Sequence, residues 1–317
     1  MQTAEISFPL FGEDFIINPP GSISIFGFDL YLYGFLIMLG FVLAGLYMYR
    51  RREAFNLTQE NVLDLIILAV PCGIVGARIY YAIFNFSDYF GPGKWLNIFM
   101  LRQGGLAVYG GVIGGAIAFY IYSRRKKESV WKYCDAASFG LFIGQAVGRW
   151  GNFLNREAYG TVTDVPWRMG LKGNYGFTYV HPTFLYESLW NIVGFVIFHI
   201  LSKKRPSKYY GQYFLYYIAW YGFGRYMIEG IRTDSLFVYG TDIRISQLLA
   251  AVSFSAAVIL LIRNHLRGNN TTAKTNLPLP ADGPPIDAAT DDESPDETLS
   301  EGVLAETENN AETPEDV

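Results

Sequence analysis

Seven long apolar stretches, separated by polar or charged residues, constrain the fold of this chain more than any other feature. Each has roughly the length of about 20 residues that an α-helix needs to cross the hydrocarbon core of a bilayer. A soluble core does not require so many runs of this length. The pattern therefore predicts an all-α, polytopic membrane protein with about seven transmembrane helices, the second broken by Pro71. The predicted spans are residues 30–49, 62–84, 104–122, 133–151, 183–201, 211–228 and 243–262.

Basic clusters follow the first, third and fifth stretches and predict how the chain is oriented. With these clusters inside, the inner loops and their borders hold fourteen Lys and Arg residues, and the outer loops hold seven. This excess satisfies the positive-inside rule. We therefore expect the amino terminus outside, with residues 1–29 at the membrane interface, and the carboxyl terminus in the cytoplasm.

Charge divides the chain into two unlike parts. Residues 1–267 carry twenty-four Lys and Arg against sixteen Asp and Glu, whereas residues 268–317 carry one Lys and thirteen Asp and Glu. The tail explains why the mean hydropathy is only +0.18 although 51% of the residues are hydrophobic. We expect a membrane-embedded domain at residues 1–267 and a disordered acidic cytoplasmic tail at residues 268–317, to which we assign no chemistry.

The fourth stretch runs into a concentration of polar groups, Gly148-Arg-Trp-Gly-Asn-Phe-Leu-Asn-Arg-Glu-Ala-Tyr-Gly160. A charge at membrane depth costs a few kcal/mol on insertion scales, so an arginine such as Arg149 marks a functional site by default. The plain alternative is an arginine that snorkels from a helix end. That alternative does not account for Asn152, Asn155 and Glu157 beside it.

A second intramembrane arginine, Arg225, lies between Tyr221 and Glu229 at a spacing of four residues, so the three side chains share one helical face. One interpretation is a self-contained ion pair between Arg225 and Glu229. The other is that Arg149 and Arg225, both near the outer ends of their spans, clamp an anion, because the guanidinium fork matches a phosphodiester. In an outer leaflet the abundant anion is a phospholipid headgroup. His181 and Glu187 open the fifth span at the same level and are possible proton carriers.

Small residues indicate where helices approach each other. The fourth stretch has Ala136, Gly140, Gly144 and Gly148 at a spacing of four, and the third has a matching face of glycines. Such faces let helices pack closely. We expect them to bring helices together so that Arg149 faces something other than lipid.

Several chemistries have no support in the sequence. It contains no His-Glu-x-x-His, no Gly-x-Ser-x-Gly, no phosphate-binding glycine loop with lysine and no Cys-x-x-Cys. Cys72 and Cys134 are isolated and give no disulfide framework or metal spacing. We expect no metal, no cofactor and no nucleic-acid partner, and the chain offers no plausible serine or cysteine nucleophile.

The thirteen-residue stretch from Gly148 to Gly160 resembles the diagnostic motif of bacterial prolipoprotein diacylglyceryl transferases. The resemblance covers about residues 30–262 in the family's order, and the acidic tail lies outside it. The further matching positions are Tyr33-Gly34, Gly76-Ala77-Arg78, Gln103-Gly104-Gly105, His181-Pro182 with Glu187, and Tyr221, Arg225 and Glu229.

The resemblance implies a multi-pass enzyme of the bacterial inner membrane whose catalytic domain is residues 1–267 and whose active site faces the outer leaflet. Such an enzyme transfers the diacylglyceryl group of phosphatidylglycerol to the thiol of the lipobox cysteine in a prolipoprotein, and releases glycerol phosphate. The nucleophile then belongs to the substrate. The implied catalytic residues are Arg149, Arg225, Tyr109, Glu157 and Glu229, and the implied substrate-binding residues are Arg149, Arg225, Asn152, Tyr33, Arg78, Gly160, Tyr221 and Glu187.

One position departs from the family. Many members have a histidine before the Gly-Gly pair of the third span, proposed as the base, and this chain has Tyr109. A phenol holds its proton too tightly to serve as a base near neutral pH. Tyr109 then hydrogen-bonds the phosphate or orients another group. The base is Glu157, Glu187 or Glu229, or the thiolate forms through arginine electrostatics alone.

Two other classes of function could use intramembrane charges. A transporter of an anionic lipid or solute would use the same arginines as a binding site, but transporters often contain internal repeats, and the sequence has no second copy of the Gly148–Gly160 motif. A structural membrane scaffold would not need three intramembrane arginines, Arg149, Arg225 and, in the second span, Arg78. The sequence therefore favours the transferase.

Overall fold

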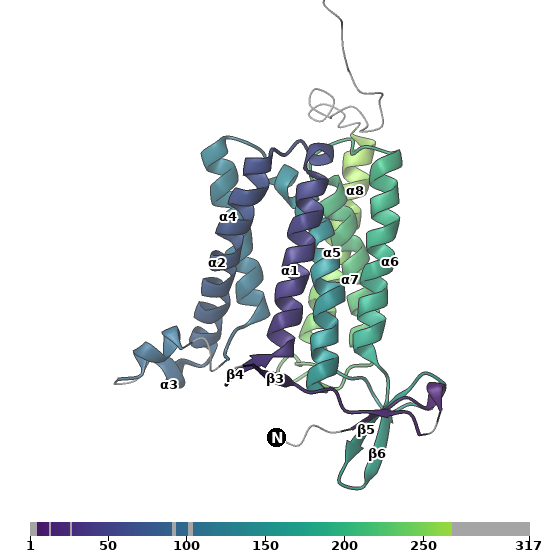
Figure 1. Cartoon of the computed structure of the whole chain (residues 1–317). Coiled ribbons are helices and arrows are strands. Elements are labelled where there is room, and N and C mark those ends of the chain that lie inside the picture. The colour runs from purple at the N-terminus through teal and green to yellow at the C-terminus, as the bar shows by residue number, and fades with distance from the viewer. Residues whose placement is uncertain (1–4, 13, 26, 91–92, 101–103, 268–317) are drawn as a thin grey trace, which may run out of the picture. The chain divides into compact units, whose positions relative to one another are not determined.

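A long helix forms at each of the seven apolar stretches in the computed structural model of the chain (Figure 1), which describes residues 5–12, 14–25, 27–90, 93–100 and 104–267. Four of them, α1, α2, α6 and α8, are long and apolar enough to cross a membrane. The predicted helical, multi-pass architecture is confirmed to that extent, while the disorder predicted for residues 268–317 lies outside the described residues. The long helices are α1 (Leu32–Arg50), α2 (Gln59–Phe84), α4 (Val108–Lys126), α5 (Val130–Asn155), α6 (Thr183–Lys204), α7 (Gln212–Glu229) and α8 (Ile245–Leu266).

The helices alternate in direction, so the basic clusters gather at one end of the bundle (Figure 1, top). We call it the basic end. The predicted break in α2 is wrong: the helix runs through Pro71. The helix also has a well-formed start, where Thr58 and Asn61 make a reciprocal capping box. A proline removes one backbone hydrogen bond but does not remove the apolar length that favours a continuous helix.

The prediction of an all-α fold left out short strands at the opposite end, which we call the sheet end (Figure 1). β1 pairs with both β2 and β5, so the amino-terminal segment is fastened to the excursion between α5 and α6. Ile6, Phe153, Met169, Val180 and Phe184 form the apolar cluster beneath this sheet. The four-stranded sheet has the order β2 (Ile16–Ile17), β1 (Ile6–Ser7), β5 (Met169–Gly173), β6 (Gly176–Val180), and β3 (Ser22–Ile25) pairs with β4 (Phe28–Tyr31). The remaining short elements are η1 (Pro9–Phe11), η2 (Arg52–Phe55), α3 (Phe86–Tyr89) and η3 (Trp95–Phe99).

The two glycine faces predicted to match do not pack on each other. On α5, a Cβ at Gly140 would lie 3.3 Å from Ala44 of α1. On α4, a Cβ at Gly114 would lie 2.2 Å from the carbonyl oxygen of Cys72 of α2. The small residues were therefore recognised correctly as packing residues, but each face has a different partner helix from the one expected.

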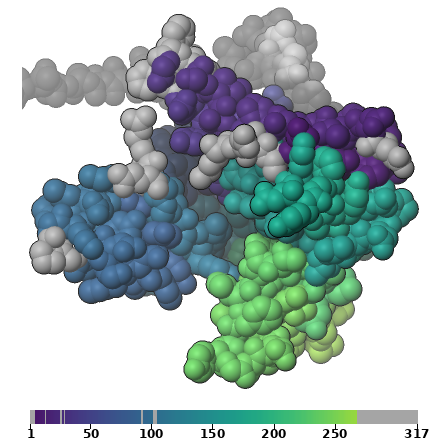
Figure 2. Space-filling view, turned by 90° about the horizontal axis from the view of Figure 1, so that it is seen from below, coloured from purple at the N-terminus to yellow at the C-terminus, as the bar shows by residue number. Residues whose placement is uncertain are grey.

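This packing pairs α2 with α4, and this pair stands beside the other long helices. At the basic end, side chains of the α2–α4 pair and of the other helices pack together in one apolar cluster that includes Leu65, Tyr122, Tyr133 and Phe139. The Tyr122 hydroxyl also donates to Asp64 across 3.0 Å. At the sheet end, Figure 2 shows a recess between the α2–α4 pair (blue) and the other helices.

Two tryptophans fix how α6 and α7 lie against each other. The indole of Trp190 donates to the Trp220 carbonyl, and the indole of Trp220 donates to the Trp190 carbonyl, each across 3.0 Å. The rings stack with centroids 4.3 Å apart. Each indole also lies over a glycine of the facing helix, Gly194 or Gly224. This arrangement sets the register that brings Glu187 of α6 near Arg225 of α7.

Gly224→Ala is expected to lower the stability of the protein and its activity together. The new Cβ would lie 2.1 Å from the Trp190 indole nitrogen, which is held by its own hydrogen bond. Overpacking of this kind costs about 1–3 kcal/mol. Thermal unfolding in detergent measures the change. Gly115→Ala is the control, because nothing lies within 4 Å of its Cβ position; equal unfolding temperatures for the two variants would contradict the proposed fit.

Candidate active site

Three helices bring Arg149, Glu187 and Arg225 together at the sheet end. Arg149 comes from the last turns of α5, Glu187 from the first turns of α6 and Arg225 from the last turns of α7. Arg149 Nη2 lies 2.5 Å from Glu187 Oε2, and Arg225 Nη1 lies 3.0 Å from Glu187 Oε1. Arg225 Nη2 also lies 2.6 Å from Glu229 Oε2. Arg225 and Glu229 are therefore not a self-contained pair, because Glu187 joins both arginines.

Arg232 completes this group, although its position in the sequence indicates only one of the seven basic residues of the outer loops. Its Nη1 lies 3.2 Å from Glu187 Oε1, and its Nε and Nη2 donate to Asp234 across 2.8 and 2.6 Å. Burial alone would lower the pKa of Arg232 and raise that of Asp234, but their mutual contact reverses both directions, so both stay charged. The close spacing of the charged residues Glu229, Arg232 and Asp234 is the sequence feature that could have indicated the role of Arg232. We call Arg149, Arg225 and Arg232 with Glu187, Glu229 and Asp234 the arginine cluster.

Arg149 and Arg225 keep hydrogen-bond donors that their described neighbours do not use. A guanidinium has five N–H donors. Arg149 uses Nη1 toward Asn152 and Nη2 toward Glu187, and Arg225 uses Nη1 and Nη2 toward two carboxylates. Their side chains are 20% and 14% exposed. Two guanidiniums held near one carboxylate, with donors to spare, are suited to binding a phosphodiester.

Arg78, predicted to bind the headgroup, has different partners. Its five donors all go to backbone carbonyls in one loop, and the side chain is almost completely buried. It also lies over the ring of Tyr89, 4.9 Å from the centroid. The geometry gives Arg78 the role of holding the connection between α2 and α4 and leaves no donor for a phosphate. The carbonyls belong to Asn97, Ile98, Met100, Gly104 and Gly105.

Asn152 connects the arginine cluster to Glu157. Its Oδ1 accepts from Arg149 across 3.2 Å, and its Nδ2 donates to Glu157 Oε1 across 2.9 Å. The chain leaves α5 through Arg156, which has a left-handed backbone, and this turn folds Glu157 back toward the helix end. The ring of Tyr33 lies against Gly151, where a Cβ would be 2.1 Å away. The predicted residues of this stretch and Tyr33 are thus brought together.

Gly160 serves the site through its backbone. Its N–H donates to the His181 carbonyl across 2.9 Å, and it forms a β-bridge with Arg232. A Cβ at Gly160 would lie 2.7 Å from that of His181. The last residue of the motif is therefore a glycine because three chain segments meet there, and this meeting positions Arg232 next to Glu187.

Comparison with known proteins identifies the family. The prolipoprotein diacylglyceryl transferase profile matches residues 20–263, which include every residue of the arginine cluster. The chain belongs to the prolipoprotein diacylglyceryl transferase family.

Similar proteins named phosphatidylglycerol–prolipoprotein diacylglyceryl transferase support this assignment to the transferase family. The one from Enterococcus faecalis is 42% identical over 246 residues, covering 75% of this chain and 87% of the relative. Those from Clostridioides difficile and Streptococcus pneumoniae are 39% and 40% identical over 236 and 238 residues. They cover 74% and 73% of this chain, and 91% and 88% of the relatives. The acidic tail begins after the match to the transferase family ends.

Tyr109, the position at which this chain departs from many members of the transferase family, makes no described contact with the arginine cluster. It lies in the first turn of α4, in the pair formed by α2 and α4, and is 51% exposed. Its ring lies 6.5 Å from that of Tyr80, and among the described residues it has no hydrogen-bond partner. The Tyr109 phenol is therefore exposed and engaged by no described hydrogen bond, and its predicted role stays a prediction.

Two other predicted residues of the transferase site take supporting positions. Glu229 is buried, with Oε1 accepting from Ser235 across 2.8 Å and Oε2 beside Arg225. Tyr221 stacks on Tyr217, 5.8 Å away, one helical turn from Arg225. Both therefore lie where the transferase resemblance put them, next to Arg225 on α7.

His181, considered as a proton carrier, is part of a chain of polar contacts at the sheet end. The Trp167 indole donates to the Tyr186 hydroxyl across 2.7 Å, and that hydroxyl lies 3.0 Å from His181 Nδ1. Because Tyr186 accepts from Trp167, its own proton is available to His181 Nδ1.

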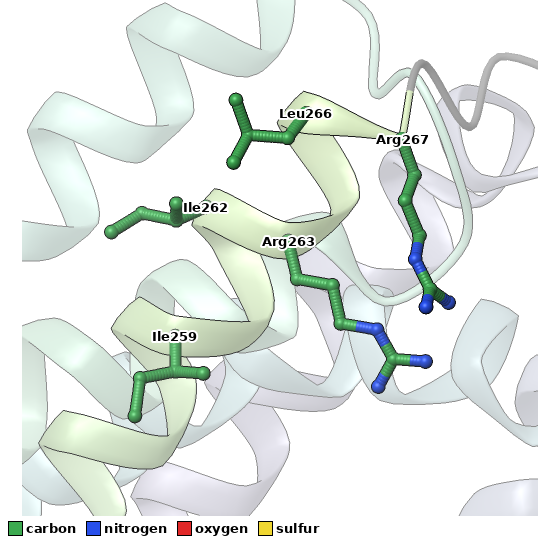
Figure 3. Close-up of a pocket in the computed structure, with 5 residues that line it drawn as sticks. All are labelled: Ile259, Ile262, Arg263, Leu266 and Arg267. Atoms are coloured by element: carbon green, nitrogen blue, oxygen red, sulfur yellow. The ribbon is translucent and has the colours of Figure 1, made fainter.

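The described residues offer no group of three His, Cys, Asp or Glu side chains that could hold a metal ion. Figure 3 shows the residues that line a shallow hollow at the end of α8, among them Arg263 and, just after the helix, Arg267. It lies at the basic end, whereas the arginine cluster lies at the sheet end, so the two are separate. The candidate active site of this transferase-family chain is the arginine cluster.

Proposed function

We propose that this chain transfers the diacylglyceryl group of phosphatidylglycerol to the thiol of the lipobox cysteine in a prolipoprotein. The observation that carries the proposal is the pair of guanidiniums, Arg149 and Arg225, held by one buried carboxylate with donors left for an anion. Membership of the transferase family and the names of the relatives support the choice of substrates.

In this proposal all seven long helices cross the bacterial cytoplasmic membrane, with the basic end inside. The basic residues that end α1, α4, α6 and α8 support this orientation, because such residues are retained in the cytoplasm. The arginine cluster then lies near the outer leaflet. Its charges are balanced by the carboxylates around them, which is how charged groups are tolerated at that depth.

The proposed reaction exchanges one bond for another. The sulfur attacks the glyceryl carbon that carries the phosphate, a C–S bond forms and the C–O bond to the phosphate breaks. The thiol loses its proton, and the departing glycerol phosphate gains one negative charge. Donors placed in advance around the phosphate stabilise that charge as it develops, and Arg149 and Arg225 are those donors.

Of the three carboxylates considered as the base, Glu157 fits best. Both oxygens of Glu187 are engaged by arginines, and Glu229 is buried between Arg225 and Ser235. Glu157 is exposed, and only its Oε1 has described partners, the amides of Asn152 and Asn155. Its Oε2 can accept the thiol proton, while Asn152 keeps the carboxylate next to Arg149.

Glu157→Gln is expected to lower kcat about 100-fold while phosphatidylglycerol binding is retained, because an amide keeps the size but cannot accept the thiol proton. Steady-state kinetics with a cysteine peptide measure kcat. A profile of rate against pH adds a second readout: the variant should gain rate as the pH approaches the pKa of the free thiol. If kcat stayed within a few fold of wild type, Glu157 would not be the base.

Phospholipid turnover tests the proposed function against the transporter alternative. Purified protein in detergent is given phosphatidylglycerol, with or without a lipobox peptide, and released glycerol phosphate is measured. The proposal predicts release only when the peptide carries a free thiol. Binding of phosphatidylglycerol without release in the presence of that peptide would contradict the transferase and favour a transporter.

A further inference from the structure

The connection between α7 and α8, residues 230–244, has a polar side and an apolar side. Arg232, Asp234 and Ser235 on its polar side belong to the arginine cluster or bind it. On its other side, Leu236 is 72% exposed and Tyr239 fully exposed. The connection lies at the sheet end, the face seen in Figure 2.

The connection is held in place at its base. Arg244 donates to the Glu229 carbonyl and lies over the ring of Phe237, 5.8 Å from the centroid. The Ile245 amide donates to the Leu236 carbonyl across 2.9 Å, and Val238 and Ile243 are similarly joined. Phe237 and Ile243 add to the exposed apolar surface, at 50% and 52%. The apolar side chains are thus presented by a fixed loop that is continuous with the active site.

We propose that Leu236, Phe237, Tyr239 and Ile243, here called the apolar rim, bind the precursor through the apolar segment that precedes its cysteine. This inference rests on the proposed function. A secretory signal peptide has an apolar region followed by small residues before its processing site. A thiol at the arginine cluster would place that apolar segment within a few residues of the cluster, and the apolar rim is on the same loop as Arg232.

The charge pattern supports a peptide over the phospholipid as occupant. The phosphate is matched by Arg149 and Arg225, whereas the four side chains of the rim are uncharged. The charged residues nearest to the rim along the chain are Asp234 and Arg244, which are engaged within the loop, and the exposed Asp242. Phosphatidylglycerol would therefore be bound by the cluster, and the rim would recognise the second substrate. Exposed apolar side chains beside a site mark such interaction surfaces.

A binding measurement tests this separately from turnover. The probe is a fluorescent lipobox peptide in which serine replaces the cysteine, so that it binds but cannot react. The double variant Leu236→Ser/Tyr239→Ser removes two exposed side chains with no described hydrogen bonds of their own. We expect its Kd for the peptide to rise about tenfold.

The matched control is Val162→Ser/Tyr175→Ser, which removes equally exposed apolar side chains elsewhere at the sheet end. Its Kd should equal that of wild type. An unchanged Kd in the rim variant, or an equal loss in the control, would overturn the proposal. A rise only in the KM for phosphatidylglycerol would show that the rim faces lipid and would also overturn it. Normal peptide binding without turnover in wild type would count against the proposed function and not against the rim.

Discussion

Arg149→Lys is expected to lower kcat/KM about 100-fold or more, although the charge is kept. Lysine presents its three donors from one nitrogen and cannot place them in the two separate directions in which the guanidinium fork meets Asn152 and Glu187 while leaving a donor for a phosphate oxygen. Loss of one donor aimed at a developing anion typically costs about 100- to 1000-fold in rate. Steady-state turnover of phosphatidylglycerol and a lipobox peptide measures the effect.

The matched control for this prediction is Arg52→Lys. Arg52 lies at the basic end and pairs with the neighbouring, exposed Glu53. Its replacement should leave turnover unchanged. Near-normal turnover by Arg149→Lys would show that charge alone is sufficient and that the fork geometry is not required.

Glu187→Gln is expected to remove activity and to destabilise the protein. The carboxylate is 5% exposed and is shared by Arg149, Arg225 and Arg232. Removing one partner of a buried ion pair typically costs about 3–5 kcal/mol, because the remaining charges are left without compensation. Here the three guanidiniums would lose the negative charge that they share, and an NH2 group that cannot accept would replace one of the two acceptor oxygens.

Thermal unfolding in detergent, with and without phosphatidylglycerol, measures this second effect. Glu5→Gln is the control, because Glu5 forms an exposed pair with Lys172. Exposed pairs contribute about 0–1 kcal/mol, so its unfolding temperature should hardly change. A Glu187→Gln protein as stable and active as Glu5→Gln would show that Glu187 does not hold the cluster together.

The sequence was sufficient to find Arg149, Arg225 and Glu187, because charged residues stand out in apolar stretches. It was not sufficient to assign Arg78 and Arg232. Arg78 lies within an apolar stretch and Arg232 in a loop, and only the structure shows that Arg78 donates to backbone carbonyls while Arg232 joins Glu187. Hydrogen-bond partners distant in sequence decide the role of such a side chain.

The fold, like the site, could be predicted from the sequence only in part. Hydrophobic length predicted the seven long helices, but not which glycine face meets which helix, because the pairing depends on the whole bundle. The strands at the sheet end were missed because some are only two residues long, as in β1 and β2. Strands that short have no detectable alternation and form only when β5 supplies a partner.

The most direct test of the central claim is to identify the product. Purified protein in detergent is incubated with phosphatidylglycerol and a lipobox peptide, and mass spectrometry follows the peptide, with a Cys→Ser peptide as control. The account predicts a diacylglyceryl thioether on the cysteine peptide alone. An unmodified cysteine peptide, in protein shown to be folded and to bind phosphatidylglycerol, would contradict it.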